Sequence, residues 1–243
     1  MTSSRHAAHN WMRACAHILM SLLPFVLVEG ALHLIGYGPT LALFIPAARI
    51  GANEYLQINP DVARRYFPRS EVDFLPRPAN DIFRRKKPAN GYRLFVMGES
   101  TTEGWPYPHG VMFSRLLWRR VSALFPDKTI EVVNTGITAM NSYALRDFTD
   151  EILDQQPDAI LIYAGHNEYY GALGVASTVS LGRAPWLIRL YLSLRRFKTF
   201  LLLRDLVDAL THRGAAAQGS PDRATLMGRV IGRASVPYGS PAY

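Results

Sequence analysis

Three short polar clusters carry the residues with which this chain could do chemistry. Ser100 follows one apolar run, Gly136 follows a second and Asn167 follows a third. A serine hydroxyl can attack a carbonyl carbon when a neighbouring base removes its proton. A backbone N–H group and an asparagine side-chain amide can stabilise the negative charge that develops on the carbonyl oxygen. These residue types do not define a reaction by themselves, so the elements that position them must be considered.

The elements around the clusters predict a parallel sheet. Apolar runs at residues 94–97, 130–134 and 159–163 are typical of strands covered on both faces, and residues 112–125 and 143–155 have the apolar spacing of helices. Alternating strands and helices favour right-handed crossovers, which bring the carboxyl ends of the strands to one edge of the sheet. We therefore expect a three-layer, flavodoxin-like α/β fold with all three clusters on that edge.

The order and approximate spacing of the clusters resemble the SGNH or GDSL-like hydrolases. Gly98-Glu99-Ser100 resembles the first family block, with Glu in place of the usual Asp. Gly136 resembles the glycine of the second block, and Gly165-His166-Asn167 resembles the Gly-x-Asn of the third. The likeness covers about residues 91–174. The amino-acid sequence of residues 165–171 is similar to that of a membrane-anchored bacterial subgroup. Members of this subgroup often carry downstream helical repeats, and none is visible in this sequence.

The resemblance implies a role for each matching residue. Ser100 would be the nucleophile that forms an acyl-enzyme, and its N–H, the N–H of Gly136 and the amide of Asn167 would stabilise the oxyanion. Further residues of the same clusters would contact the substrate: Glu99, Thr101, His166, Glu168 and Tyr169. Aromatic and acidic residues nearby could also line a pocket, because aromatic rings stack on sugars and carboxylates bind hydroxyl groups: Glu103, Trp105, Tyr107 and Tyr170.

The general base is the part of the family pattern that this chain lacks. The family supplies it from an Asp-x-x-His, and the chain contains none. Asp208 and His212 are one residue too far apart, His166 does not match the family's base, and His109 follows Ser100 on a loop. The simplest interpretation is a chain that stops before the Asp-x-x-His block.

Composition narrows the classes of function. The chain has 243 residues, a formal net charge of +8 and a single cysteine, Cys15, which cannot form an internal disulfide. The positive net charge is compatible with anionic partners. No nucleic-acid module or basic strip with interleaved aromatics is evident, however, so we expect no nucleic-acid partner. No metal-ligand spacing or Walker-type phosphate loop is found, and we expect no cofactor.

Residues 14–35 form an apolar stretch long enough to cross a bilayer as a helix. Arg5 and Arg13 precede it, which favours a cytoplasmic N-terminus at residues 1–13 and a catalytic domain outside the inner membrane. A cleaved signal peptide is the rival interpretation. Glu29 is discordant in such a stretch, and either pairs with His33 one turn away or sits near the interface or against another helix.

Residues 36–90 read as a proline-rich connector with short strands or turns, and residues 91–243 as the hydrolase-like domain. Residues 185–210 are predicted to form a helix or a helix pair. The resemblance implies hydrolysis of an ester, such as an O-acyl group on a glycan or lipid. Two alternatives stay open: acyl transfer to a glycan hydroxyl, and a non-catalytic binding protein that keeps the pocket.

Overall fold

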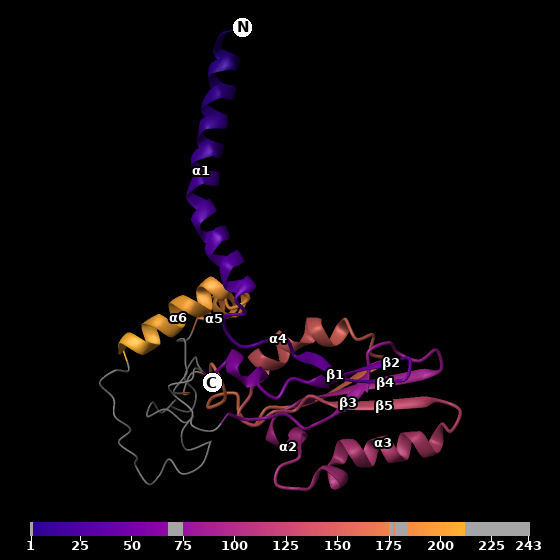
Figure 1. Ribbon diagram of the computed structural model, residues 1–243. Coiled ribbons are helices and arrows are strands. Elements are labelled where there is room, and N and C mark those ends of the chain that lie inside the picture. The colour runs from indigo at the N-terminus through magenta and orange to yellow at the C-terminus, as the bar shows by residue number, and fades with distance from the viewer. Residues whose placement is uncertain (1, 68–74, 175–176, 178–183, 212–243) are drawn as a thin grey trace. The chain divides into compact units, whose positions relative to one another are not determined.

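The computed structural model describes residues 2–67, 75–174, 177 and 184–211 (Figure 1). It divides into two compact units. One is formed from Met1–Pro39 and Ser193–Gly214, and the other contains Thr40–Leu192. Every predicted site residue between Glu99 and Tyr169 belongs to the second unit.

A parallel sheet of three strands organises the second unit. Its strands are β4 (Gly91–Gly98), β5 (Thr129–Asn134) and β6 (Ala159–Tyr163), in the order β5-β4-β6. Both pairings are parallel. The three predicted strands are confirmed, and their order is that of the first three strands of a flavodoxin-like sheet.

Helices lie on both faces of this sheet, as Figure 1 shows with α4 (Ser142–Leu153) on one side and α3 (Phe113–Leu124) on the other, whereas the last three residues of β6 are exposed. Alternate residues of β4 point to opposite faces. Phe95 and Met97 join the core cluster that includes Phe148 of α4, whereas Val96 packs with Phe113 of α3. Burial on both faces explains why the apolar run of β4 is continuous, and the predicted α/β class is confirmed.

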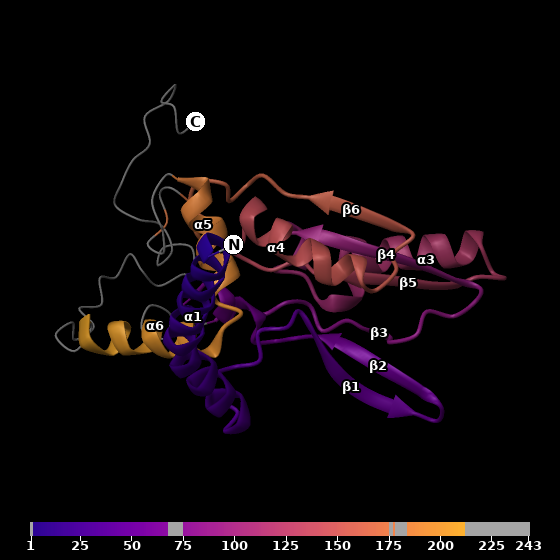
Figure 2. The same cartoon turned by 90° about the horizontal axis from the view of Figure 1, so that it is seen from above.

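The stretch predicted as a connector contributes a second, antiparallel sheet to the same unit. Its strands are β1 (Phe44–Ile50), β2 (Asn53–Ile58) and β3 (Ile82–Arg84), in the order β1-β2-β3, and Val62–Arg65 form the 3₁₀ helix η1. Figure 2 shows these strands beside the parallel sheet. Several of the buried side chains join the main core cluster: Leu43, Leu56, Ile58, Val62, Ala63, Tyr66, Phe67 and Phe83. Much of this stretch therefore packs as part of the globular unit.

Residues 185–210 form two helices, α5 (Pro185–Leu194) and α6 (Lys198–Thr211). The first unit contains α6 together with the long helix α1 (Thr2–Leu34). Among the described residues, no helix is long and apolar enough to cross a membrane, so the span predicted over residues 14–35 is unsupported.

Glu29 of α1 holds the first turn of α6. Its carboxylate accepts hydrogen bonds from the backbone N–H groups of Lys198 and Thr199, both 2.8 Å away, and from the Thr199 hydroxyl. His33 also lies 3.0 Å from the carboxylate, as the spacing along α1 predicted. The first N–H groups of a helix lack intrahelical acceptors, so this carboxylate serves as a cap supplied by another helix.

Candidate active site

Ser100 begins the short helix α2 (Ser100–Glu103), directly beyond the carboxyl end of β4. The residue is half-buried. No hydrogen bond of its hydroxyl to another described residue is found. The structure thus places Ser100 at the predicted sheet edge, without a base in contact.

Glu99 connects the cluster around Ser100 to the cluster around Asn167. Its fully buried carboxylate accepts hydrogen bonds from the backbone N–H groups of Gly165, at 2.9 Å, and His166, at 3.0 Å. Glu99 was predicted to contact substrate, yet both carboxylate oxygens bind backbone in this structure. The residue fixes the turn beyond β6 beside Ser100.

Thr102 makes a second connection between these clusters. Its hydroxyl donates to the carbonyl oxygen of Tyr163, at 2.9 Å, so α2 is held against the end of β6. Gly98 permits this approach, because a Cβ there would collide with the Thr102 side chain and the Tyr163 carbonyl. The turn around Ser100 is therefore fixed by backbone and side-chain contacts on both sides.

Asn134, which sequence analysis did not assign to the site, organises the second cluster. Its Nδ2 donates to the carbonyl oxygen of Thr102, at 2.6 Å, and to the hydroxyl of Ser114, at 3.1 Å. Its Oδ1 accepts the N–H of Gly136, at 2.9 Å. The buried asparagine thus joins α2, α3 and the loop after β5. Its place directly before Thr135-Gly136 was the available sequence signal.

Gly136 has a steric role that the sequence predicted only in part. A Cβ at this position would collide with the backbone N of Glu103 and lie 2.8 Å from the backbone carbon of Thr102. The absence of a side chain therefore lets α2 pack closely on the loop. Its N–H, predicted to stabilise an oxyanion, is occupied by Asn134.

Asn167 is buried beyond β6, and its Nδ2 has no hydrogen-bond partner among the residues that the structure describes. Its backbone carbonyl accepts the N–H of Gly171, at 2.6 Å, which closes the loop around it. A buried amide donor without an acceptor is uncommon and costs about 1–3 kcal/mol. Such a group is suited to a charge that appears only during a reaction.

The other four residues predicted to contact substrate have different surroundings in the structure. Glu168 accepts hydrogen bonds from the backbone N–H, at 3.0 Å, and the hydroxyl, at 2.6 Å, of Ser142, so it caps α4. Thr101 is exposed and Tyr169 is half-buried. The His166 ring is half-exposed and packs edge-on against Tyr163. Of the five residues predicted to contact substrate, Glu99 and Glu168 bind other parts of the protein.

Each described histidine near the site faces a carboxylate. Nε2 of His109 lies 3.3 Å from the buried Asp81, and Nδ1 of His166 lies 3.6 Å from Glu99. His212, the other predicted candidate for the base, lies outside the described residues. No base contact to Ser100 is thus present in the part of the chain that the structure describes.

Asp81 joins His109 to the second cluster. Its carboxylate accepts the backbone N–H of Asn134, at 2.7 Å, and an N–H of Arg115, at 2.8 Å. Burial raises the pKa of the Asp81 carboxyl, and Arg115, the Asn134 N–H and His109 oppose that rise. Sequence analysis had placed Asp81 in the connector, where no local pattern pointed to the site.

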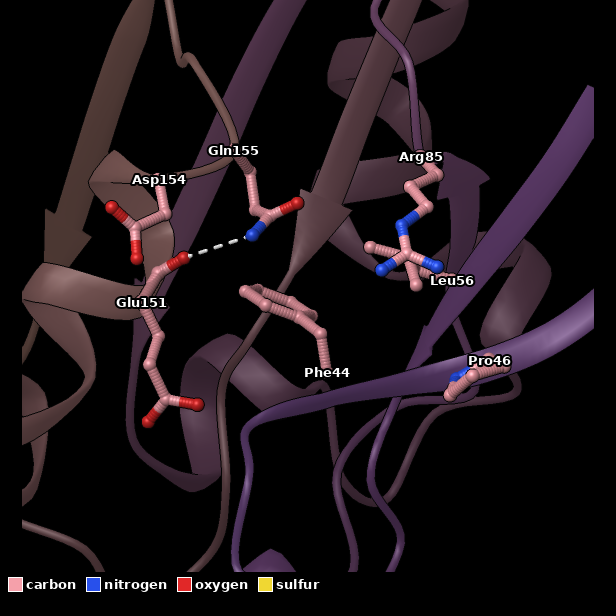
Figure 3. Close-up of a pocket in the computed structure, with 7 residues that line it drawn as sticks. All are labelled: Phe44, Pro46, Leu56, Arg85, Glu151, Asp154 and Gln155. Carbon is pink, nitrogen blue, oxygen red and sulfur yellow. Dashed lines mark hydrogen bonds between the residues drawn. The ribbon is translucent and has the colours of Figure 1, made fainter.

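A pocket of about 260 Å³ lies elsewhere in this unit (Figure 3). Glu151, Asp154 and Gln155 line one side of it at the end of α4, and Arg85 lines another. The carbonyl oxygen of Gln155 accepts from Arg93, near the first residues of β4. The pocket is therefore at the amino end of the strands, opposite the edge that carries Ser100, and it contains none of the predicted site residues.

Within the described residues, no group of three or more His, Cys, Asp or Glu side chains could hold a metal ion. Comparison with protein-family models, curated proteins and solved structures finds no match. The resemblance to SGNH hydrolases therefore rests on the three clusters themselves, and the geometry of those clusters carries the functional argument.

Proposed function

We propose that this protein is a serine hydrolase that acts on ester bonds, with Ser100 as nucleophile. The observation that carries the proposal is the unpartnered, buried amide of Asn167 in the loop that Glu99 binds beside Ser100. A nucleophile and an uncharged donor at one sheet edge are two of the three groups that acyl transfer requires, and the third is a base for the serine proton.

In the proposed reaction, the Ser100 oxygen attacks the ester carbonyl carbon while a base takes the hydroxyl proton. The tetrahedral intermediate then collapses, and the alcohol leaves with a proton. Water next attacks the acyl-serine, which releases a carboxylic acid and restores the serine. The Nδ2 of Asn167 would donate to the oxyanion in both halves of the reaction, together with the N–H of Ser100 at the start of α2.

In this proposal, the cluster around Gly136 has a supporting role because of the contacts that Asn134 makes. Because its Oδ1 accepts the N–H of Gly136, that N–H is not counted among the oxyanion donors. The cluster instead positions α2, since Asn134 also binds the carbonyl oxygen of Thr102. Ser100 would thus be held from the side of β5 by Asn134 and from the side of β6 by Glu99.

Labelling with a fluorophosphonate probe tests the assignment of Ser100. We expect the full chain to be labelled at one serine and Ser100→Ala to lose the label. Ser122→Ala on α3 is the matched control and should be labelled like the parent. Undiminished labelling of Ser100→Ala would show that another residue is the nucleophile.

A non-catalytic binding protein is the second candidate, and the absence of a described base in contact with Ser100 favours it. In that case the parent protein would resist the probe at millimolar concentration and over hours. Retained ester binding by Ser100→Ala, without labelling of the parent, would then replace the hydrolase proposal.

A further inference from the structure

We propose that the loop after α2 is a sugar-binding platform, formed by the rings of Trp105 and Tyr107, for an O-acylated, uncharged glycan. This inference rests on the proposed function, because it names the substrate class that would be presented to Ser100. The platform itself can be tested by binding alone, without any turnover.

The two rings are among the most exposed aromatic side chains of the unit. Trp105 is 72% exposed and Tyr107 is 66% exposed. Large aromatic rings contribute most when they are buried, so two neighbouring rings left in water need an explanation. Stacking on the apolar face of a pyranose ring is an interaction that flat, exposed aromatic side chains can provide.

The loop that carries the rings is fixed in place by several contacts. The N–H of Trp105 donates to the Glu103 carboxylate, at 3.1 Å, and the N–H of Tyr107 donates to the Gly104 carbonyl oxygen, at 2.8 Å. Farther along, His109 faces the buried Asp81. These contacts fix the backbone of the loop before a ligand arrives, which lowers the entropic cost of binding.

The platform is also adjacent to the candidate nucleophile. The N–H of Gly104 donates to the carbonyl oxygen of Ser100, at 2.9 Å, so a single helical turn separates Ser100 from the loop. A turn of α-helix rises about 5.4 Å, which is comparable to the length of one sugar residue. A sugar stacked on Trp105 could therefore present an ester on its own ring or on the next one to Ser100.

The charges around the rings favour a glycan over a lipid surface. Aromatic residues that dock on anionic headgroups are accompanied by lysine or arginine. Residues 104–112 contain neither, and the ionisable groups at the loop are Glu103 and His109. Burial raises the pKa of the Glu103 carboxyl, opposed by the Trp105 N–H. A carboxyl group and an imidazole beside the two rings can bind sugar hydroxyl groups, and Arg115, which shares the Asp81 carboxylate with His109, is paired with that buried acid.

The test measures binding of O-acetylated cellotetraose to the full chain carrying Ser100→Ala, by titration calorimetry. Adding Trp105→Ala or Tyr107→Ala should weaken binding about tenfold or more, whereas Trp105→Phe should retain most of it because the stacking face is kept. The matched control is Trp186→Ala, which removes a tryptophan that is 62% exposed on α5 and should change the Kd less than twofold.

Three results would overturn the platform. The first is equal binding by the parent and Trp105→Ala, and the second is no binding by the parent at millimolar sugar. The third is a loss of partitioning to phosphatidylglycerol vesicles in Trp105→Ala with sugar binding unchanged, which would assign the rings to a lipid surface. Vesicle partitioning that is unaffected by the substitution supports the glycan.

Kinetics with Ser100 intact then separates this inference from the proposed function. Trp105→Ala should raise KM for the acetylated tetrasaccharide about tenfold and affect kcat/KM for 4-nitrophenyl acetate much less, whereas Trp186→Ala should change both quantities less than twofold. If Ser100→Ala leaves both esterase activity and probe labelling intact, the nucleophile assignment fails while the binding result stands. If Trp105→Ala affects both esters equally, the platform fails while Ser100 keeps its role.

Discussion

Asn167 is buried at the sheet edge with an amide nitrogen that has no acceptor. A structural asparagine in such a position would be expected to satisfy its donors, as Asn134 does with the Thr102 carbonyl oxygen and the Ser114 hydroxyl. The Nδ2 of Asn141, the N-cap of α4, also lacks a partner among the described residues, so the role proposed for Asn167 depends on its place in the loop that Glu99 binds beside Ser100.

Replacing Asn167 by Leu should therefore separate activity from stability. We expect kcat for ester hydrolysis to fall about 10²–10³-fold with little change in KM, because one oxyanion donor is lost. The free energy of unfolding should be unchanged or higher, since a buried unpaired donor costs about 1–3 kcal/mol and the leucine has none. Urea denaturation and steady-state kinetics on the same preparation measure both quantities. A large loss of stability with normal kcat would make Asn167 structural.

Gly136 supports a prediction about packing. Gly136→Ala would place a Cβ against the backbone of Glu103 and Thr102, which cannot move as freely as a side chain. We expect the free energy of unfolding to fall by about 1–3 kcal/mol, as is typical of overpacking. Gly110→Ala is the matched control, because nothing lies within 4 Å of the position that its Cβ would take. Equal effects of the two substitutions, measured by urea denaturation, would show that the contact between α2 and the loop after β5 is not tight.

At the scale of elements, the sequence predicted the strands and helices well because each has a local pattern. The continuous apolar run of β4 reflects burial on both faces, and the helical spacing of α3 and α4 reflects one buried face each. The contacts that hold the site residues in place have no local pattern in the sequence. Glu99 binds N–H groups 66 and 67 residues away, and Asp81 binds one 53 residues away. Only folding brings these partners together, so a substrate role for Glu99 could not be distinguished from a structural one beforehand.

The cap that Glu29 provides to α6 predicts a dependence on pH. Burial alone would raise the pKa of Glu29, but hydrogen bonds from Thr199, Lys198 and His33 lower it from 4.5 to about 2. A carboxyl group with a depressed pKa in the folded state adds stability above its unfolded pKa, and that stability is lost as pH falls toward the folded value. We therefore expect the first turn of α6 to loosen between about pH 4.5 and pH 2.

Hydrogen-exchange protection factors of the Lys198 and Thr199 amides measure this effect. Glu29→Gln should lower protection at pH 6 and remove most of the change between pH 6 and pH 3. Asp205→Asn, which alters the carboxylate that accepts from the Tyr37 hydroxyl in the same unit, is the control and should leave these two amides protected. Protection in the parent that does not change with pH would remove Glu29 as the cap.

At the scale of the whole molecule, the candidate site draws on both sheets of the second unit. Ser100, Asn134 and Asn167 come from the edge of the parallel sheet, and Asp81 comes from the segment that leads into β3. The antiparallel sheet thus contributes a buried carboxylate as well as part of the core. This explains how residues that read as a connector in the sequence become part of the support for α2 and α3.

The turnover of a simple ester by the full chain depends on the base, which leads to the last prediction. In a well-studied serine hydrolase, losing the histidine alone lowers kcat on the order of 10⁶-fold, because the catalytic residues act as a unit. Since no described histidine contacts Ser100, turnover of 4-nitrophenyl acetate above the Ser100→Ala background requires a histidine to move into contact with the serine, and we expect steady-state kinetics to show the loss of that turnover in one histidine variant. Turnover by the parent at the background rate would favour the non-catalytic binding protein. The variants His109→Ala, His166→Ala and His212→Ala identify the base: loss of activity in one of them alone would assign the proton transfer to that side chain, and for His109 or His166 it would require the ring to turn from its carboxylate toward Ser100.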